Sequence, residues 1–596
     1  MKLPYFSSTA KSRDYQTVFY GYNHTENCRD GEFYDMKNMS SDLYPVLSQR
    51  GKRGVYSYPE GTTYKSATAL ISKDALCYVS GDKFIVNNHE AEGFTVKSSG
   101  DVPTTLISMG AYVIFMPQRQ WYNTANGESG DIDSFFEEKT IKFTLAKSDG
   151  TAWGTLSTIK PEAGSETDGA QYIDTTVVPN VVKQYSESSK AWFSVASTYI
   201  KMESEGINDY FSAGDGVVIS NIPTDQGEVT DKNFANLNGA NVVVSSGVGD
   251  NGVGYIVVTG LMQAEREIQG ITVTRKMPEM DFIVESQNRL WGCKYGLTED
   301  GKVVNEIYAS KLGDFKNWNC FEGIASDSYA VSVGTDGQFT GAITYQGYPI
   351  FFKEECVHKV FGSIPANYQV QTTACNGVQK GCGRSLAIVN NVLFYKGISG
   401  IYAYDGSLPV LASSVFGNED YDSAVAGEFG NKYYVSLCNT KTKKHEFFVY
   451  DTEKGFWHKE DDLNATQFCK DGTNLYYLSA TDDLIHTVFG GGKGAESRLD
   501  WFIETGALGK DSPNKKYYTK LNARMLLEPM ARVSFYAEYD STGGWQHLCT
   551  VEGRTMQSFN IPIRLRRCDH LRLKIQGRGK VQIHSLSKTS REGSDI

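Results

Sequence analysis

Short runs of alternating apolar and polar residues, separated by glycine-containing turns, recur along this chain. The stretch NNVLFYKGISGIYAYDG (390–406) shows the pattern, with two aromatic strands on either side of a Gly-Ile-Ser-Gly turn. Glycine supplies the positive φ that tight hairpin turns require. Heptad repeats and long amphipathic helices are missing from the sequence, so the pattern predicts an all-β protein.

The hairpins repeat with a period of about 40 residues. Pairs of apolar residues mark the expected first strand of each hairpin, and they are Cys77-Tyr78, Ile114-Phe115, Leu290-Trp291, Phe351-Phe352, Phe394-Tyr395, Tyr433-Tyr434 and Tyr476-Tyr477. A β pattern with this period favours the four-stranded blades of a β-propeller. Unrelated hairpins in β-sandwiches would also give aromatic pairs and remain the alternative. The longest step, between Ile114 and Leu290, indicates one blade with an insertion of about 135 residues.

The composition changes along the chain and predicts five segments. They are an N-terminal arm (1–54), the first propeller blades (55–138), an inserted β-barrel or sandwich (139–280), the remaining blades (281–490) and a C-terminal β-sandwich (498–596). The insertion is rich in Ser, Thr, Gly and Val, which is typical of short strands joined by tight turns. The glycine-rich stretch 489–497 predicts a flexible joint. We also expect a strand of the N-terminal arm to complete a blade formed by later sequence, because closure removes exposed strand edges.

The net charge of −11 argues against a general nucleic-acid binder. Residues 500–596 contain 16 Lys and Arg against 10 Asp and Glu, or +6, so the first 499 residues carry −17. The eleven cysteines lack metal-ligand spacing, which predicts mostly reduced, buried thiols in a protein folded in cytoplasm. Because every apolar run is too short to cross a bilayer, we expect no membrane span.

The candidate catalytic and metal-binding motifs lack the residue spacing that their chemistry requires. His445-Glu446 lacks the second histidine of a zinc helix, Cys568 and His570 lack two further ligands, and the Gly397–Gly400 turn lacks a residue of a nucleophile elbow. Neighbouring carboxylates such as Glu460 and Asp461 are more typical of solvated turns than of a hydrolase pair. The sequence therefore predicts that the chain is not an enzyme and needs no metal or cofactor.

Two other sets of residues are candidates for binding. In IPIRLR (561–566) and HLRLKIQ (570–576), Arg564, Arg566, Arg572 and Lys574 alternate with apolar residues, which predicts one basic face on two neighbouring strands. That face is either a solvated surface or a docking face for an acidic partner or for DNA phosphates. In the insertion, Trp192 and Phe193 either pack within a strand or present aromatic rings to sugars.

Three segments resemble the tail nozzle proteins of short-tailed bacteriophages, also called tail-hub or stabilisation proteins. They are DMKNMSSDLYPVLSQRGKRG (35–54), SQNRLWGCKYG with NEIYASKLGDFKNW (286–318) and WFIETGALG (501–509). The resemblance implies a virion protein that forms a ring, expected to be a hexamer, below the portal and adaptor proteins. Such a ring retains the phage genome and then releases it, in contact with tail fibres or other tail proteins. The insertion has no matching counterpart in this resemblance.

Two further function classes stay open. The chain is alternatively a tail-tip adhesin that binds host surface glycans through the insertion, or a glycosidase propeller. The sialidase form of the last class is expected to repeat Asp-box turns, which KSDGTAW (147–153) and DSTGGW (540–545) only approximate. If the chain lines a DNA conduit, we expect an acidic bore that lets double-stranded DNA pass without tight binding.

Overall fold

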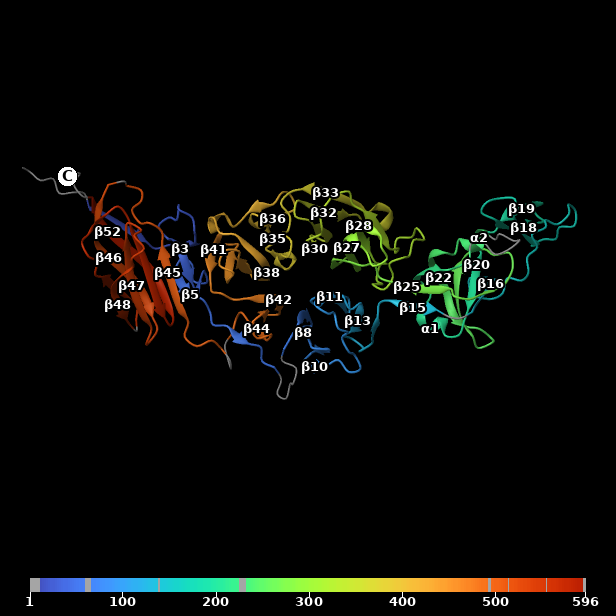
Figure 1. Cartoon of the computed structure of the whole chain (residues 1–596), viewed down its shortest axis with the longest axis horizontal. Coiled ribbons are helices and arrows are strands. Elements are labelled where there is room, and N and C mark those ends of the chain that lie inside the picture. The colour runs from blue at the N-terminus through green and yellow to red at the C-terminus, as the bar shows by residue number, and fades with distance from the viewer. Residues whose placement is uncertain are drawn as a thin grey trace, which may run out of the picture. The chain divides into compact units, whose positions relative to one another are not determined.

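The computed structural model describes residues 11–58, 66–137, 140–223, 232–490, 495–512, 514–553 and 555–592. Strands make up nearly all of its regular structure (Figure 1). The chain forms two compact units, one of residues 1–104, 352–357 and 373–596, the other of residues 105–351 and 358–372. The fold class is therefore all-β, with propeller blades, an inserted β domain and a C-terminal sandwich, as the sequence predicts.

Seven four-stranded sheets with the antiparallel order of propeller blades lie within the described residues. Their strands are β7 (Ala69–Lys73), β8 (Ala75–Ser80), β9 (Lys83–Val86) and β10 (His89–Glu90); β11 (Thr105–Met109), β12 (Tyr112–Met116), β13 (Gln120–Asn123) and β14 (Ser129–Asp131); β26 (Phe282–Ser286), β27 (Arg289–Leu297), β28 (Val303–Ala309) and β29 (Tyr329–Ser332); β30 (Gly341–Tyr345), β31 (Tyr348–Phe352), β32 (Cys356–Phe361) and β33 (Gln369–Ala374); β34 (Ala387–Val389), β35 (Val392–Gly397), β36 (Gly400–Tyr404) and β37 (Val410–Leu411); β38 (Tyr421–Phe429), β39 (Lys432–Asn439), β40 (His445–Asp451) and β41 (Phe456–Lys459); and β42 (Ala465–Asp471), β43 (Asn474–Ser479) and β44 (Ile485–Thr487) with β6 (Gly54–Val55).

The seven apolar pairs found in the sequence all lie in the second strand of a blade. Each second strand has neighbours on both sides within its sheet, and it carries buried side chains such as Phe351 and Tyr433. Turns with positive φ precede several of these strands, for example Asn390 and Asn391 with φ of 48° and 62°. Asparagine tolerates this conformation better than most residues, which favours the tight hairpin. The period in the sequence thus reflects one buried strand per blade.

The N-terminal strand β6 completes the last blade, as expected from the sequence. It pairs with β44, with Val55 opposite His486 and Gly54 opposite Thr487. The same blade also contacts the first blade, because the Gln467 side chain exchanges hydrogen bonds with the backbone of Leu70 (3.0 and 2.8 Å). These contacts cover strand edges that would otherwise be free to pair with another chain.

The inserted domain has one curled sheet of eight strands around a single core, and a separate three-stranded sheet. The eight-stranded sheet runs β15 (Ser134–Glu137), β25 (Thr272–Arg275), β21 (Gly216–Ser220), β22 (Gly239–Val248), β23 (Gly254–Thr259), β20 (Tyr199–Glu203), β16 (Ile141–Ala146) and β24 (Arg266–Ile268). The smaller sheet contains β17 (Gln171–Asp174), β18 (Val181–Ser186) and β19 (Ala191–Ser194), and two short helices are α1 (Ile207–Tyr210) and α2 (Lys232–Ala235). Buried residues from both edges of the large sheet, including Phe143, Met202 and Val273, share the core.

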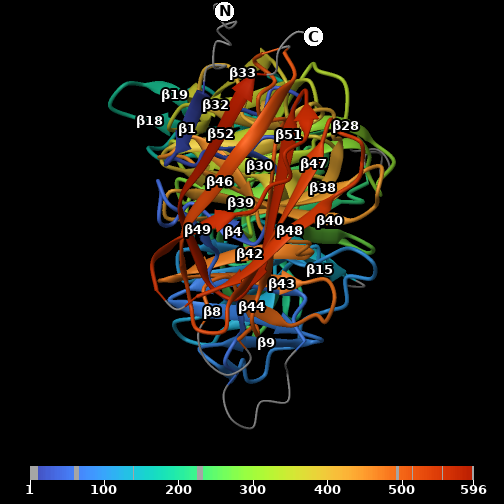
Figure 2. The same ribbon diagram turned by 90° about the vertical axis from the view of Figure 1, so that its left-hand side faces the viewer.

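The C-terminal domain is a two-sheet sandwich to which the N-terminal residues also contribute strands (Figure 2). One sheet contains β1 (Lys11–Gln16), β4 (Met39–Ser40), β5 (Leu47–Gln49), β46 (Lys516–Leu527), β49 (Gln557–Ile561), β50 (Arg567–Cys568) and β52 (Val581–Glu592). The other contains β2 (Gly21–Tyr22), β3 (Glu32–Lys37), β45 (Asp500–Thr505), β47 (Arg532–Tyr539), β48 (Gln546–Glu552) and β51 (Leu571–Arg578). Strands β1 to β5 are therefore part of the sandwich rather than a separate arm.

Candidate functional site

The inserted domain is fixed to the blades of its own unit by a buried polar cluster. Arg275 donates from Nη1 to Asp215 Oδ2 (2.5 Å) and from Nη2 to Ser134 Oγ (2.9 Å). Asn317, from the loop after β28, donates to Asp215 Oδ1 (3.0 Å) and accepts from the backbone N–H of Gly216 (2.8 Å). Buried charges are tolerated when they are paired and hydrogen-bonded. We call Asp215, Arg275 and Asn317 the insertion cluster; it ties one end of the insertion to a blade loop.

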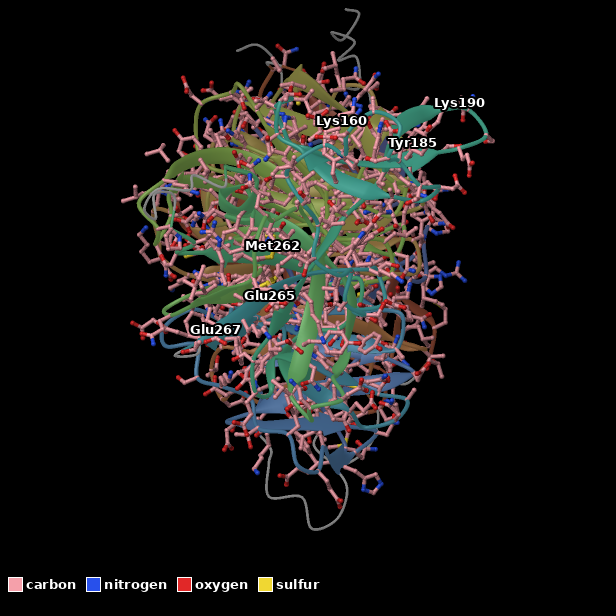
Figure 3. All side chains as sticks on the ribbon, turned by 90° about the vertical axis from the view of Figure 1, so that its right-hand side faces the viewer. Lys160, Tyr185, Lys190, Met262, Glu265 and Glu267 are labelled. Carbon is pink, nitrogen blue, oxygen red and sulfur yellow. The ribbon has the colours of Figure 1, made fainter. Side chains whose placement is uncertain are left out.

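A groove lies on the outer face of the inserted domain's large sheet, over β16 and β20. Register pairs Lys142 with Glu203 and Thr144 with Lys201, so these four polar side chains form a square on one face. The alternating residues of these strands, such as Phe143, point into the core. The groove encloses about 280 Å³, at the lower end of small-molecule sites. Met262 and Glu265, from the segment before β24, also line it and lie close together in Figure 3.

Charges in the groove are paired. Lys201 Nζ lies 2.8 Å from Glu203 Oε1, and these side chains are 15% and 13% exposed, at the floor. Lys142 Nζ lies 3.6 Å from Glu265 Oε2 at the exposed rim. Lys201 also lies over the ring of Tyr255 at 4.4 Å from its centroid. The lining thus has two ammonium groups and two carboxylates, with no net charge.

The loop that forms one wall of the groove is held in place by its own hydrogen bonds. Asp149 accepts from the backbone N–H and hydroxyl of Thr151 (2.9 and 2.7 Å), and its carbonyl accepts from Tyr255 Oη (3.2 Å). Gly150 has φ of 84°, and a Cβ there would lie 2.6 Å from the Tyr255 ring. Glycine is therefore required for the loop to pack on this ring.

Trp192 and Phe193, the candidate sugar-binding aromatics, point to opposite faces of β19. The Trp192 ring packs against Tyr172 and Tyr185, with centroid distances of 4.9 and 5.3 Å. Phe193 is 52% exposed. Trp192 therefore contributes to packing in the three-stranded sheet, while Phe193 is the residue of this pair that is open to a partner.

The predicted basic face differs in structure from the expectation. Residues 562–566 form no strand, and Leu565, expected to point inward, is 70% exposed. Pro562 cannot donate to a ladder, and β49 ends just before it. Arg564 and Arg566 therefore lie in an exposed connection and not on a sheet face shared with Arg572 and Lys574.

Arg572 and Lys574 do lie on the outer face of β51, but acidic side chains from neighbouring strands pair with them. Arg572 bonds to Glu504 through Nη2 and to Glu538 through Nη1 (3.2 Å), and Lys574 lies 3.8 Å from Glu504. Both cations also lie over the Trp545 ring. The expected basic face on two neighbouring strands is therefore not formed, since only Arg572 and Lys574 lie on a strand, and a docking role for the four residues stays a prediction.

The carboxylates Glu460 and Asp461 are held in a buried ionic network. Arg53 donates to both (2.6 Å each), and Arg50 donates to Asp461 (3.0 Å) and to Glu496 (2.7 Å). We call these five residues the closure cluster, because they join the N-terminal segment, the blades and the chain that leads into the sandwich. Burial raises the pKa of Glu460, but the contact with His458 and the charges of Arg53 and Arg50 outweigh it and lower the pKa to about 2.

A chain of hydrogen bonds links Ser541 Oγ to His570 Nε2 (2.7 Å) and His570 Nδ1 to Asp569 Oδ2 (2.9 Å). The order is that of a serine nucleophile, its base and an orienting carboxylate. Asp569 is 48% exposed, so water weakens its electrostatic hold on His570. Its backbone N–H also donates to Asp540 Oδ1 (2.7 Å). We assign these hydrogen bonds the role of fixing the turn after β47.

Among the described side chains, no group of three or more His, Cys, Asp or Glu residues has the arrangement of a metal site. In the described part of the chain, every helix falls short of the length and apolar character needed to cross a membrane. His445 and Glu446 lie in strand β40, where Glu446 accepts from Tyr421 Oη (2.7 Å). They therefore belong to a blade and not to a zinc helix.

Comparison with known proteins finds neither a matching family model nor a matching curated protein. Solved structures that match include an exo-β-1,3-galactanase from Phanerochaete chrysosporium with galactose (9% identity, 50% of this chain, 94% of that chain, TM-score 0.19). Others are a glycoside hydrolase (12%, 50%, 96%, 0.19) and a Trypanosoma rangeli sialidase with sialic acid (8%, 88%, 94%, 0.16).

These matches correct one expectation from the sequence. The matched structures are enzymes that bind or cleave glycans, so the prediction that this chain is not an enzyme is contradicted and withdrawn. The identities and TM-scores are too low to transfer a substrate, an activity or a catalytic residue to this chain.

Proposed function

We propose that this chain is a structural protein of a phage tail, in the manner of the ring-forming nozzle proteins that three of its segments resemble. In this role several copies surround the channel through which the genome is retained and ejected. The portal and adaptor proteins contact the ring, and tail fibres or other tail proteins attach to it.

The observation that carries this proposal is where the resembling segments lie. The first and third segments, from opposite ends of the sequence, are neighbours in one sheet: β3 pairs with β45, with Met36 opposite Ile503 and Lys37 opposite Phe502. The second segment forms β27 and β28 and supplies Asn317 to the insertion cluster. Two of the segments that resemble one family thus pair within the sandwich, and the third connects a blade to the insertion, which supports a shared construction.

The charge distribution along the sequence supports the proposal independently of the resemblance. A conduit must avoid many Lys and Arg contacts to phosphate, because each such contact adds to tight, salt-dependent binding. The first 499 residues carry −17, and ring symmetry multiplies this charge around one axis. We therefore expect an acidic bore and weak binding of duplex DNA at about 100 mM salt.

The test is the assembly state of the purified full-length chain. Light scattering after gel filtration should give a mass several times 66.1 kDa, and negative-stain images should show rings with a central channel. A monomer at every concentration, or tight binding of duplex DNA by the ring, would contradict the proposal.

A second function, binding of host glycans by a tail-tip adhesin, is favoured by one observation. Phe193 is exposed on the three-stranded sheet, at the end of the inserted domain far from β27 and β28 of the same unit (Figure 1). Exposed aromatic rings bind the apolar faces of sugars, and Phe193→Ala should then lower glycan-array signals without changing assembly. Equal signals from both proteins would remove this function from consideration.

A further inference from the structure

We propose that the groove over β16 and β20 is a binding site for a neutral saccharide of one or two rings. The site differs from the exposed aromatic at Phe193, and the proposal does not depend on ring formation.

Hydrogen-bonding capacity on the floor points to a ligand that both donates and accepts. A carboxylate such as Glu203 accepts and an ammonium such as Lys201 donates. A hydroxyl group does both, so adjacent hydroxyls of a sugar can bridge this pair (2.8 Å apart) without losing a partner. Thr144, opposite Lys201 in the register, adds a hydroxyl to the same face.

The charge balance indicates a neutral ligand. The two Lys and two Glu residues of the lining are already paired, with distances of 2.8 and 3.6 Å. Lys201 would attract an anion, but Glu203 beside it would repel the same anion. A cation would be attracted by Glu203 and repelled by Lys201. A neutral polar ligand meets no such opposition, and the floor pair stays intact when it binds.

One wall of the groove is apolar and matches the C–H faces of a sugar ring. Leu145 and Leu156 line it with partly exposed side chains, and they pack on the fully buried Ile173 in the small core between the three-stranded and eight-stranded sheets. A polar floor beside an apolar wall is the usual composition of small-molecule sites. The volume of about 280 Å³ limits the ligand to one or two rings.

The site is formed before any ligand arrives. The Asp149–Thr151 turn and its contact with Tyr255 hold one wall, and the paired strands hold the floor. Preorganisation lowers the entropy cost of binding. Affinity in the millimolar range is expected for so small a ligand at a partly open site.

The experiment is saturation-transfer NMR on the full-length protein with glucose, galactose, N-acetylglucosamine, maltose and lactose. Sialic acid and glucosamine serve as anionic and cationic probes. At least one neutral sugar should bind, and Glu203→Gln and Lys201→Met should each weaken its binding about tenfold. Ala264→Trp, which fills the rim from an exposed position, should abolish it.

Glu267→Gln is the matched control, because Glu267 pairs with Lys142 in the register but does not line the groove (Figure 3). This variant should bind like the unchanged protein. The proposal is overturned if no neutral sugar binds, if a charged probe binds better than all of them, or if Ala264→Trp leaves binding unchanged while the protein stays folded.

Discussion

Two buried ionic clusters fix the insertion and the N-terminal segment to the blades, and they are built differently. The insertion cluster has one ion pair, Arg275 with Asp215, assisted by the amide of Asn317. The closure cluster has two arginines and three carboxylates, drawn from segments at opposite ends of the sequence.

The difference follows from how each part is connected. An inserted domain leaves and re-enters the blades through two adjacent strands, so covalent linkage already restricts it. The sandwich contains both ends of the described chain, and the last blade needs β6 from one of them. Non-covalent contacts must therefore hold these segments together, and more of them are present.

The largest expected effect comes from Arg53→Ala. This change leaves Glu460 and Asp461 buried without their main partner, and uncompensated buried charge costs about 3–5 kcal/mol. The free energy of unfolding, measured in urea, should fall by an amount near the top of that range. Arg532→Ala is the matched control, since its pair with Glu552 is 70% and 61% exposed. A loss below about 1 kcal/mol for Arg53→Ala would show that the cluster does not hold the closure.

The second-largest effect is expected from low pH, which should weaken the closure cluster. The pKa of Glu460 is about 2 in the folded chain, below its ordinary value, so its contribution is fully present above about pH 4.5 and is lost as pH falls toward 2. The shift corresponds to about 3 kcal/mol. Stability curves of the unchanged protein and of Glu460→Gln should therefore converge on acidification through this window. Parallel curves would contradict the assigned pKa.

Arg275→Leu tests the insertion cluster and should have a smaller effect, about 2 kcal/mol. Asp215 keeps hydrogen bonds from Asn317 and from the backbone of Ser212 (3.0 Å each), which softens the loss. Hydrogen exchange should rise in β15, β21 and β25 and stay unchanged in the sandwich. Increased exchange in the sandwich would mean that the two clusters are coupled.

The smallest effect on stability is expected for Arg564→Glu with Arg566→Glu. Both residues lie in an exposed connection, where substitutions usually change stability by less than about 0.5 kcal/mol. If they dock a partner or another subunit, assembly should fail while the melting temperature is retained. Arg572 and Lys574 are left unchanged here, because reversing them would break their pairs with Glu504. Normal assembly of this variant would show that Arg564 and Arg566 belong to a solvated surface and dock no partner.

The blades could be predicted from the sequence because each buries one central strand, and a pair such as Phe351-Phe352 marks that strand without reference to the rest of the chain. The sandwich strands β1, β3 and β5 could not, since their partners β45 and β52 come from the other end of the sequence. The acidic partners of Arg572 were missed for the same reason, as Glu504 and Glu538 belong to other strands that only the fold brings beside β51.

The groove gives a further example of this limit. Lys142 and Glu203 are ordinary surface residues in the sequence, and the register of β16 and β20 brings them together. The expected strand at 561–566 failed for a local reason, since Pro562 interrupts the alternation that Ile563 and Leu565 would otherwise continue. Pro562 was therefore the feature of the sequence from which the end of the strand could have been predicted.

Completion of the last blade by β6 has a consequence for how the protein is made. Its partner β44 is translated about 430 residues later, which at roughly 5–20 residues per second is about 20 to 90 seconds. During this interval β1, β3, β5 and β6 lack the partners that later sequence supplies, and strand edges without partners are prone to associate with other chains. Productive synthesis therefore depends on protecting β1 to β6 until the C-terminal strands emerge, and yield should fall steeply as ribosomes crowd on one message.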